Sequence, residues 1–412
     1  MTNFLAGNHI QLLRSGEEYF PALTFAIENA NNSIYLQTYI YEIDKAGIAI
    51  GNALKQAAQR GLSVNILLDG FGCNDMPKAY LLELENAGVQ VMFYRPKISP
   101  WTLKKNRLRR LHRKIALVDN KIAFVGGINI IDDYNVPDNT PPRIDYAVRI
   151  EGTLLPSIAA SVYKLWRRMA FRRLNLTLSN NTISDKKLTK KKLKSDDVTA
   201  GDLKSDHLKP TVIKGTTAIE GIRAAFILRD NVLHRRDIEN AYLTAINAAK
   251  SEIIIANAYF VPGRRFRQAL LMAAKRNVKI ELLLQGRMEY FLMFATHAFY
   301  SLFLKNGIQI YEYRKSYMHC KVAVIDGNWA TVGSSNIDPF SMLLAREANI
   351  VVQDTTFASE LRSEICSAIR EGAHQVTTQE WLQGNLYKRA LSWLIYGMVR
   401  AFMGVIGNSK EQ

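Results

Sequence analysis

Three features are scarce or missing in this chain of 412 residues, and each one narrows the possibilities. Its three cysteines, Cys73, Cys320 and Cys366, are isolated from one another and lack the spacing of a metal site, which favours a reducing compartment over a disulfide framework. No stretch reaches the roughly 18 uninterrupted apolar residues of a membrane-spanning helix. The first residues also lack the basic region and apolar core of a secretory signal.

Acidic residues are outnumbered, with 37 Asp and Glu against 54 Lys and Arg, so the net charge is +17. Residues 95–114 contain nine of these basic residues and no acid. Such a run can be an ordinary solvated loop, but beside a phosphate-binding site we favour an anion-attracting rim. Residues 176–215 combine several lysines with Ser, Thr, Asn and Asp and lose apolar periodicity, which predicts a basic polar linker that need not be ordered.

What the chain does contain, twice, is one motif. Residues 112–129 read HRKIALVDNKIAFVGGIN, and residues 319–336 read HCKVAVIDGNWATVGSSN. Both follow the pattern H-x-K-x4-D, with a turn of small residues and an Asn at matched spacing. The copies lie about half the chain apart, which indicates duplicated lobes rather than a solenoid of short repeats.

Each copy predicts a β-hairpin. The apolar, largely β-branched runs 115–118 and 322–325 are typical of buried strands, and a second apolar run follows each one. Between the runs lie Asp119-Asn120 and Asp326-Gly327, which are hairpin-turn dipeptides. We therefore expect Asp119 and Asp326 to form turns at a distance from the chemistry.

Side-chain alternation along a strand places His112 and Lys114 on one face. If the turn has two residues, Asn129 returns to that face, so each hairpin presents an imidazole, an ammonium and a carboxamide together. Such a set suits a phosphate ester: the imidazole can attack phosphorus or move a proton, while the ammonium and amide hold the phosphoryl oxygens. One copy alone would be better explained by a buried His beside an extended Lys, but duplication favours the catalytic interpretation. The second set is His319, Lys321 and Asn336.

The similarity between the halves extends beyond the motifs. Residues 26–34 resemble residues 245–253, and residues 57–68 resemble residues 273–284, so each half reads helix, strand, helix, strand and hairpin. This alternation predicts an α/β fold with helices over a mixed sheet. We expect a first lobe at 1–175, the linker at 176–215, a second lobe at 216–387, and a terminal segment at 388–412.

The doubled motif resembles the signature of the phospholipase D superfamily, and within it the chain is most similar to bacterial cardiolipin synthases, over nearly its whole length. The resemblance implies two similar lobes, each a mixed β-sheet flanked by helices, related by a pseudo-twofold axis with the active site between them. It implies that His112 is the nucleophile and His319 the acid and base, with near-symmetry leaving the order reversible. It also includes Asp119 and Asp326 in the catalytic motif, alongside Lys114 and Lys321, and makes Asn129 and Asn336 phosphate-binding.

By the same resemblance, one acid after each motif orients an imidazole: Asp145 in IDYAVRIEG and Glu347 in LLAREANIVV. Both lie between apolar residues, where an unpaired charge would be costly. The family often has Asn two residues before the Glu, whereas this chain has Ala345. No cluster of Asp, Glu and His suggests a divalent metal, so we expect neither metal nor cofactor.

The expected reaction is phosphatidyl transfer from phosphatidylglycerol, or another donor such as phosphatidylethanolamine, to phosphatidylglycerol. Hydrolysis by a phospholipase D and cleavage of DNA by a related nuclease stay open, although nucleic acid is not the expected partner. The expected partners are anionic phospholipids, including phosphatidylglycerol and cardiolipin, at the cytoplasmic side of a bacterial membrane. Residues 388–407 predict an amphipathic helix that either lies in the membrane interface or packs on the second lobe. The oligomeric state is open.

Overall fold

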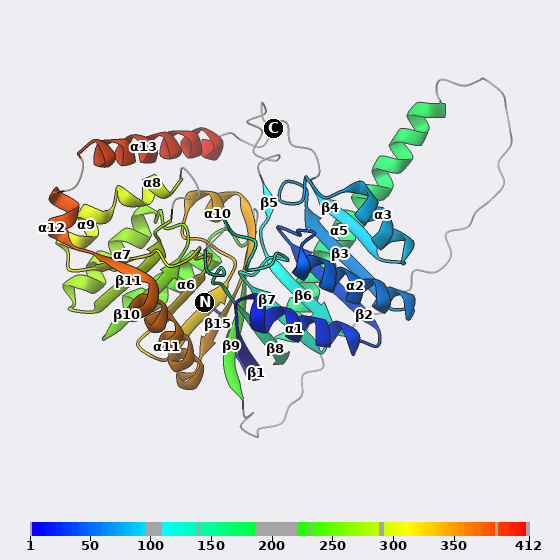
Figure 1. Ribbon diagram of the computed structural model, residues 1–412, viewed down its shortest axis with the longest axis horizontal. Coiled ribbons are helices and arrows are strands. Elements are labelled where there is room, and N and C mark those ends of the chain that lie inside the picture. Colours follow the sequence, from blue (N-terminus) through cyan, green and yellow to red (C-terminus); the bar gives the residue numbers. More distant parts are fainter. Residues whose placement is uncertain are drawn as a thin grey trace.

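The computed structural model describes residues 2–95, 109–137, 140–185, 221–230, 233–287, 292–383 and 386–408. The two halves repeat the same succession of elements, as the sequence predicts (Figure 1). The first half contains β1 (Leu5–Arg14), α1 (Ser15–Glu28), β2 (Ser33–Thr38), α2 (Lys45–Gln59), β3 (Ser63–Asp69), α3 (Lys78–Asn86), β4 (Gln90–Tyr94), β5 (Arg110–Leu111), β6 (Lys114–Val118), β7 (Ile122–Gly126), β8 (Tyr146–Gly152) and α5 (Leu155–Asp185).

The second half repeats this order and adds short helices and a terminal helix. It contains β9 (Ile222–Arg229), α6 (Asp237–Ala248), β10 (Glu252–Asn257), α7 (Arg264–Lys275), β11 (Lys279–Gln285), α8 (Leu292–His297), α9 (Tyr300–Lys305), β12 (Gln309–Tyr313), β13 (Lys321–Ile325), β14 (Trp329–Gly333), α10 (Pro339–Leu343), β15 (Ala345–Gln353), α11 (Thr355–Gly372), β16 (Ala373–Val376), α12 (Thr378–Gln383) and α13 (Leu386–Asn408).

The strand order is the same in both halves. It runs β4-β3-β2-β6-β7-β8-β1 in the first and β12-β11-β10-β13-β14-β15-β9 in the second. Strands β2, β3 and β4 are parallel while β6, β7 and β8 are antiparallel, so each half is a mixed sheet. The edge strands β1 and β9 pair antiparallel and join the two sheets into one. The predicted α/β fold of two similar lobes is therefore confirmed, and the lobes share a continuous sheet.

The apolar core forms on both faces of this sheet because its strands bury side chains on each side. Helices α1 and α2 cover one face of the first lobe, and α6 and α7 cover the matching face of the second. On the other face, α5 and α11 pack over strands of both lobes in a shared core that includes Val162 and Leu361. Cys320 lies in this core, as its alternation with His319 and Lys321 predicts.

Two predicted boundaries can be compared with the helices. Helix α5 continues past residue 175 to Asp185, into the predicted linker, because losing an apolar face does not by itself end a helix. Residues 186–220 of that linker lie outside the described residues. The predicted terminal helix is α13, which packs against α8 and lies across the second lobe (Figure 1). Within the described ranges, no helix combines the length and apolar character needed to cross a bilayer.

Candidate active site

Each motif forms a hairpin, β6–β7 in the first lobe and β13–β14 in the second. Val118 pairs with Ile122, so residues 119–121 connect the strands and the predicted two-residue turn is wrong. The longer connection accommodates left-handed backbone at Asp119 (φ 53°) and Asn120 (φ 56°). With three connecting residues, even-numbered positions pair with even-numbered ones, as Lys114 does with Gly126. Asn129 therefore does not share the strand face of His112 and Lys114. It reaches the site from the loop that follows β7, whose last residue is Gly126.

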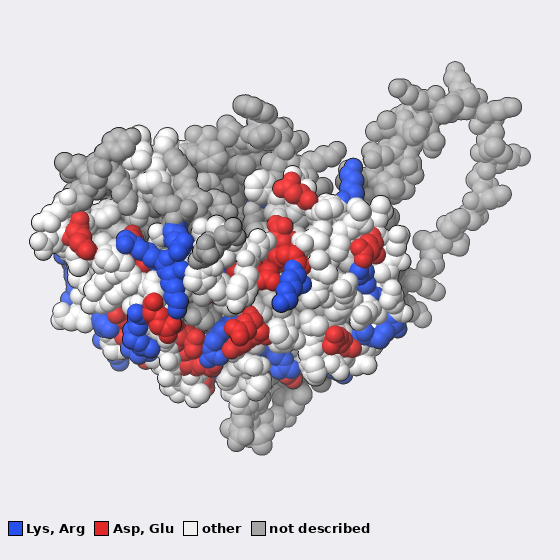
Figure 2. Space-filling model, viewed as in Figure 1, with Lys and Arg blue, Asp and Glu red and all other residues white. Residues whose placement is uncertain are grey.

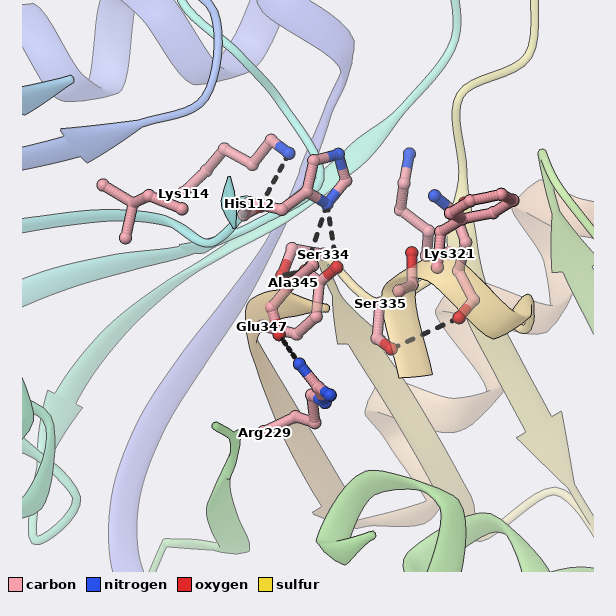
Figure 3. Close-up of polar contacts among 12 residues, drawn as sticks. His112, Lys114, Arg229, Lys321, Ser334, Ser335, Ala345 and Glu347 are labelled. Atoms are coloured by element: carbon pink, nitrogen blue, oxygen red, sulfur yellow. Dashed lines mark hydrogen bonds and ion pairs between the residues drawn. The ribbon is translucent and has the colours of Figure 1, made fainter. Parts of the chain in front are cut away.

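The orienting carboxylates cross between the lobes, as Figure 3 shows for the first histidine. The Nδ1 atom of His112 lies 3.0 and 3.1 Å from the two carboxylate oxygens of Glu347. Conversely, Nδ1 of His319 lies 2.7 Å from Oδ2 of Asp145. A carboxylate that accepts from Nδ1–H leaves Nε2 of each ring with its lone pair for chemistry.

Backbone contacts hold the same crossed arrangement. The amide of His112 donates to the carbonyl of Arg346 at 3.0 Å, and the amide of His319 donates to the carbonyl of Ile144 at 2.9 Å. Each acceptor immediately precedes the carboxylate that orients that histidine. The short strand β5 also pairs in parallel with the start of β15. Neither half-site can therefore form without the opposite lobe.

The two lysines lie beside their histidines and are buried. Lys114 Nζ donates to the carbonyl of His112 at 2.7 Å, and Lys321 donates to the carbonyl of His319. Lys321 Nζ also lies 3.8 Å from Oδ2 of Asp145. Burial lowers the pKa of Lys114 to about 7; Lys321 adds to this decrease and Glu347 opposes it. A bound anion would reverse much of this loss of charge.

The two asparagines are buried, and both line the cavity that contains the histidines. Asn129 Oδ1 accepts from the amide of Ile40 at 3.1 Å, which directs its amide nitrogen elsewhere as a free donor. Asn336 Oδ1 has no hydrogen-bond partner among the described residues. Both carboxamides are thus placed to contact a ligand in the cavity.

This cavity has a volume of about 580 Å³ and lies between the lobes. Its polar groups include both histidines, both asparagines and Asp145, and apolar side chains supply most of the remaining surface. A cavity of this size, apolar with a few converging polar groups, is typical of a site for an organic ligand. The other lining residues are Tyr39, Ile40, Phe71, Arg110, Ile128, Ile131, Asp133, Arg143, Tyr259, Asp338, Phe340, Ser341, Leu344 and Ala345.

The structure does not bring Asp119 and Asp326 to this cavity. Asp119 accepts from the backbone amides of Asn31, Asn32 and Ser33 at 2.8–2.9 Å. Asp326 makes the equivalent set with residues 250–252. These contacts tie the far end of each hairpin to the start of the neighbouring strand, in line with a turn-forming role.

Burial controls the charge of the reacting groups. It lowers the pKa of His112, which Glu347 partly restores, and it lowers the pKa of His319 still further, with Lys321 and Lys114 adding to the effect. Burial also raises the pKa of the Asp145 carboxyl to about 6 against the charge of Lys321. Both imidazoles are therefore neutral at pH 7 before an anion binds.

Two contributors were not predicted from the sequence. Ser334 Oγ donates to Glu347 at 2.5 Å and holds the carboxylate that faces His112. The Tyr39 ring packs edge-on against His112, with ring centroids 4.8 Å apart, and lies 5.4 Å from Lys114 Nζ. Ser334 could have been noticed from the sequence, because the matching position in the first motif copy is Gly127. Nothing in the sequence pattern singled out Tyr39.

Comparisons with known proteins agree with this geometry. A family model described as cardiolipin synthase, PLD-like domain, matches residues 23–139 and 242–368, one segment in each lobe. The chain belongs to this phospholipase D-like family. Within it, the chain is 35% identical to cardiolipin synthase B of Salmonella typhimurium over 402 residues, which covers 97% of this chain and 90% of that protein.

Two further matches are informative. The chain is 35% identical over 412 residues to cardiolipin synthase B of Escherichia coli (strain K12), again covering 97% and 90% of the two chains. The crystal structure of phosphatidylserine synthase from Haemophilus influenzae Rd KW20 superposes with a TM-score of 0.68, covering 98% of this chain and 96% of that one. At 14% identity this second likeness establishes the fold alone.

Proposed function

We propose that the protein is a cardiolipin synthase that transfers a phosphatidyl group from phosphatidylglycerol to the hydroxyl of a second phosphatidylglycerol. The observation that carries this proposal is the pair of imidazoles, each held at Nδ1 by a carboxylate of the opposite lobe, on one cavity. The relatives named cardiolipin synthase B support the choice of product.

In the first step, Nε2 of His112 attacks phosphorus of the donor lipid. The bond from phosphorus to the glycerol oxygen breaks, and that oxygen takes a proton from His319. A phosphodiester in the cavity supplies the negative charge that raises the pKa of His319 and lets it carry this proton. The step leaves a phosphatidyl group on His112 and releases glycerol.

In the second step, His319 removes the proton from a hydroxyl of the acceptor lipid. The hydroxyl oxygen attacks phosphorus, and the phosphorus–nitrogen bond to His112 breaks. Cardiolipin leaves, and His319 again holds a proton for the next donor. Glu347 and Asp145 stabilise the imidazolium forms and keep each ring in the reactive tautomer.

We further propose that no metal takes part. The buried ammonium groups of Lys114 and Lys321 supply positive charge beside the histidines, and the amides of Asn129 and Asn336, which line the cavity, supply donors to the phosphoryl oxygens. Asp119 and Asp326 act in this scheme only by holding the hairpins. They contact backbone amides rather than the cavity.

Transfer rather than hydrolysis requires that the lipid hydroxyl competes with water at roughly 55 M. The apolar wall formed by side chains such as Phe71, Phe340 and Leu344 favours this outcome, because acyl chains can displace water there. A phospholipase D that releases phosphatidic acid is the second candidate, since the same two-step chemistry would serve water.

We place the protein at the cytoplasmic surface of a bacterial membrane, bound to anionic phospholipids. Helix α13 packs its Ile395 and Val399 into the second lobe and exposes Trp393 (57%), Leu394 (61%) and Met398 (47%). Of the predicted apolar face, Ile395 is thus used for packing, and the exposed side chains of Leu394 and Met398 suit the interface of a bilayer. Figure 2 shows acidic and basic side chains interspersed over one face of the molecule, so the described residues of this face form no uniform basic surface for nucleic acid.

Vesicles of phosphatidylglycerol, with and without phosphatidylethanolamine, would test the reaction when products are resolved by mass. We expect cardiolipin and free glycerol; release of ethanolamine would identify the second lipid as a donor. Phosphatidic acid as the sole product would replace the synthase with a phospholipase D. Cleavage of DNA without lipid turnover would overturn both. His112→Ala serves as the blank for a contaminating lipase.

A further inference from the structure

A second cavity, which we call the arginine cavity, lies where β4 and α5 of the first lobe meet β15 of the second. It is lined by Tyr94, Leu165 and Met169 and by five arginines, which are Arg95, Arg109, Arg168, Arg172 and Arg346. No Asp or Glu is among the described residues that line it. The like charges of Arg95, Arg168, Arg172 and Arg346 around one space favour a negative ligand.

The residues that line the arginine cavity come from several elements of the fold. Tyr94 ends β4, Arg346 lies on β15, and Arg168 and Arg172 are one turn apart on α5. Beneath them, a small apolar core that includes Met92, Leu111 and Trp166 joins these elements. The positions of the guanidinium groups therefore follow from packing of the lobe.

The base of the arginine cavity is buried and its rim is open. Tyr94 and Arg109 are 3% and 8% exposed, whereas Arg168 and Arg172 on the rim are exposed. Arg346 Nε donates to the Tyr94 hydroxyl at 3.3 Å, and the Arg95 guanidinium lies 5.4 Å from the Tyr94 ring centroid. A small anion can thus enter from the rim and reach donors that are already positioned.

Charge and backbone strain support a site that is built for a ligand. Burial raises the pKa of Tyr94, but Arg346 and Arg95 outweigh this effect and bring it below its usual value. Burial lowers the pKa of Arg95, and Arg109 and Arg172 lower it further. Arg95 also has left-handed backbone (φ 56°), which is uncommon for a residue other than glycine and tends to persist at functional positions.

Size and geometry identify the class of ligand. The cavity volume is about 30 Å³, where a single water needs ~10–15 Å³ on the same measure. This space suits a small tetrahedral anion, with any substituent extending past the open rim. Guanidinium groups match the oxygens of a phosphate by paired donors. We propose that the arginine cavity binds a phosphate group, distinct from the phosphate that reacts at His112.

The arginine cavity is separate from the catalytic one but shares a strand with it. Ala345 lines the catalytic cavity, Arg346 lines the arginine cavity, and Glu347 holds His112, so alternation along β15 places them on opposite sides. Because Arg346 is next to Glu347, the rim residues Arg168 and Arg172 are the better positions for a test. They contribute nothing to the catalytic cavity.

Isothermal titration of the full chain with inorganic phosphate tests the proposal. We expect two phosphates per wild-type chain, and one for Arg168→Gln/Arg172→Gln, with affinity at the lost site reduced at least tenfold. The matched control is Lys164→Gln/Arg167→Gln, which removes the same charge from exposed positions of the same helix and should retain both sites. Equal binding by the two double variants would overturn the proposal.

A spectroscopic measurement locates the phosphate without any rim variant. The difference between wild type and Tyr94→Phe in phenolate absorbance at alkaline pH reports Tyr94 alone. A bound phosphate adds negative charge beside the phenol, so its titration should move to higher pH when inorganic phosphate is added. An unchanged Tyr94 titration at saturating phosphate would contradict binding in the arginine cavity.

Vesicle flotation then separates the two sources of the phosphate group. If a lipid headgroup supplies it, Arg168→Gln/Arg172→Gln should bind vesicles of phosphatidylglycerol in phosphatidylcholine more weakly than the control variant does. If flotation is the same for both variants while titration differs, free phosphate is the ligand. Identical behaviour of the two variants in both measurements would leave the cavity without a ligand role. None of these readouts depends on catalysis, and if the catalytic cavity binds no phosphate, the wild type should still bind one phosphate more than Arg168→Gln/Arg172→Gln.

Discussion

The two half-sites contain the same reacting groups but hold them differently. His112 faces a carboxylate, Glu347, that also accepts from Ser334. The corresponding position in the other half is Gly127, where a Cβ atom would collide with the carboxylate of Asp145. The absence of a side chain there gives Asp145 the room to lie against both His319 and Lys321.

This difference shows how a duplicated motif can divide two roles. A hydroxyl donor holds Glu347 in place beside His112, whereas Asp145 relies on Lys321 and on the backbone amide of Tyr146. The pKa of His319 is lowered well below its usual value, further than that of His112. This agrees with the proposed role of His319 as acid and base, because a phosphate charge in the cavity would raise this lowered pKa and let the ring carry a proton.

Removing either imidazole should have the largest effect. Both steps of the proposed reaction need both rings, so His112→Ala and His319→Ala should each lower cardiolipin formation by about 10⁴-fold or more. Initial rates on phosphatidylglycerol vesicles measure this loss. Near-normal turnover in either variant would show that only one half-site is catalytic.

Neutralising the orienting carboxylates should come next, at about 10³–10⁴-fold for Glu347→Gln and Asp145→Asn. The residual activity is also informative through its pH dependence. As pH drops, activity of the wild type should fall only below the usual pKa of histidine, because burial lowers the pKa of His112 and so delays protonation of the nucleophile.

For Glu347→Gln this acid limb should move to still lower pH. Glu347 favours the charged form of His112, so its removal lowers that pKa further and the neutral ring persists in more acid solution. The profile of kcat/KM against pH measures the shift. A limb that moves to higher pH would contradict the assigned contact.

Exchanging the two unequal positions sharpens the comparison directly. Gly127→Ser should displace Asp145 and cost about 100-fold, while Ser334→Gly removes one hydrogen bond to a charged group and should cost about tenfold. Initial rates and thermal midpoints should be measured together, to separate lost activity from lost stability. Equal effects would mean that the half-sites are equivalent.

The smallest expected effect is that of a chelator. Excess EDTA should change the rate of cardiolipin formation by less than about twofold, because protein ammonium and amide groups supply the charge at the phosphoryl oxygens. If EDTA abolished activity and one divalent ion restored it, the reaction would require a metal.

Much of this site follows from the sequence because its parts are local. The pairing of His112 with Lys114 depends only on strand alternation, and the apolar runs on either side of Asp119 are enough to predict a buried hairpin. The length of the turn was not predictable in this way. Asp119-Asn120 fits a two-residue turn as readily as the longer connection that forms.

The crossed contacts are the part that local patterns could not supply. Asp145 follows the first motif in the chain yet orients the histidine of the second, and sequence proximity carries no information about that exchange. It arises because β1 pairs with β9 and brings the lobes edge to edge. Likewise, the arginine cavity gathers residues from β4, β15 and α5, which only the tertiary fold places together.

The central claim is that His112 carries the phosphatidyl group while His319 moves the protons. The direct measurement uses a donor lipid labelled in its acyl chains, mixed with enzyme, quenched and resolved under denaturing conditions. Wild type and His319→Ala should carry an acid-labile, base-stable label, with the variant retaining it longer because no base activates the acceptor. His112→Ala should carry none. Label at wild-type levels on His112→Ala, and its absence from His319→Ala, would reverse the two roles.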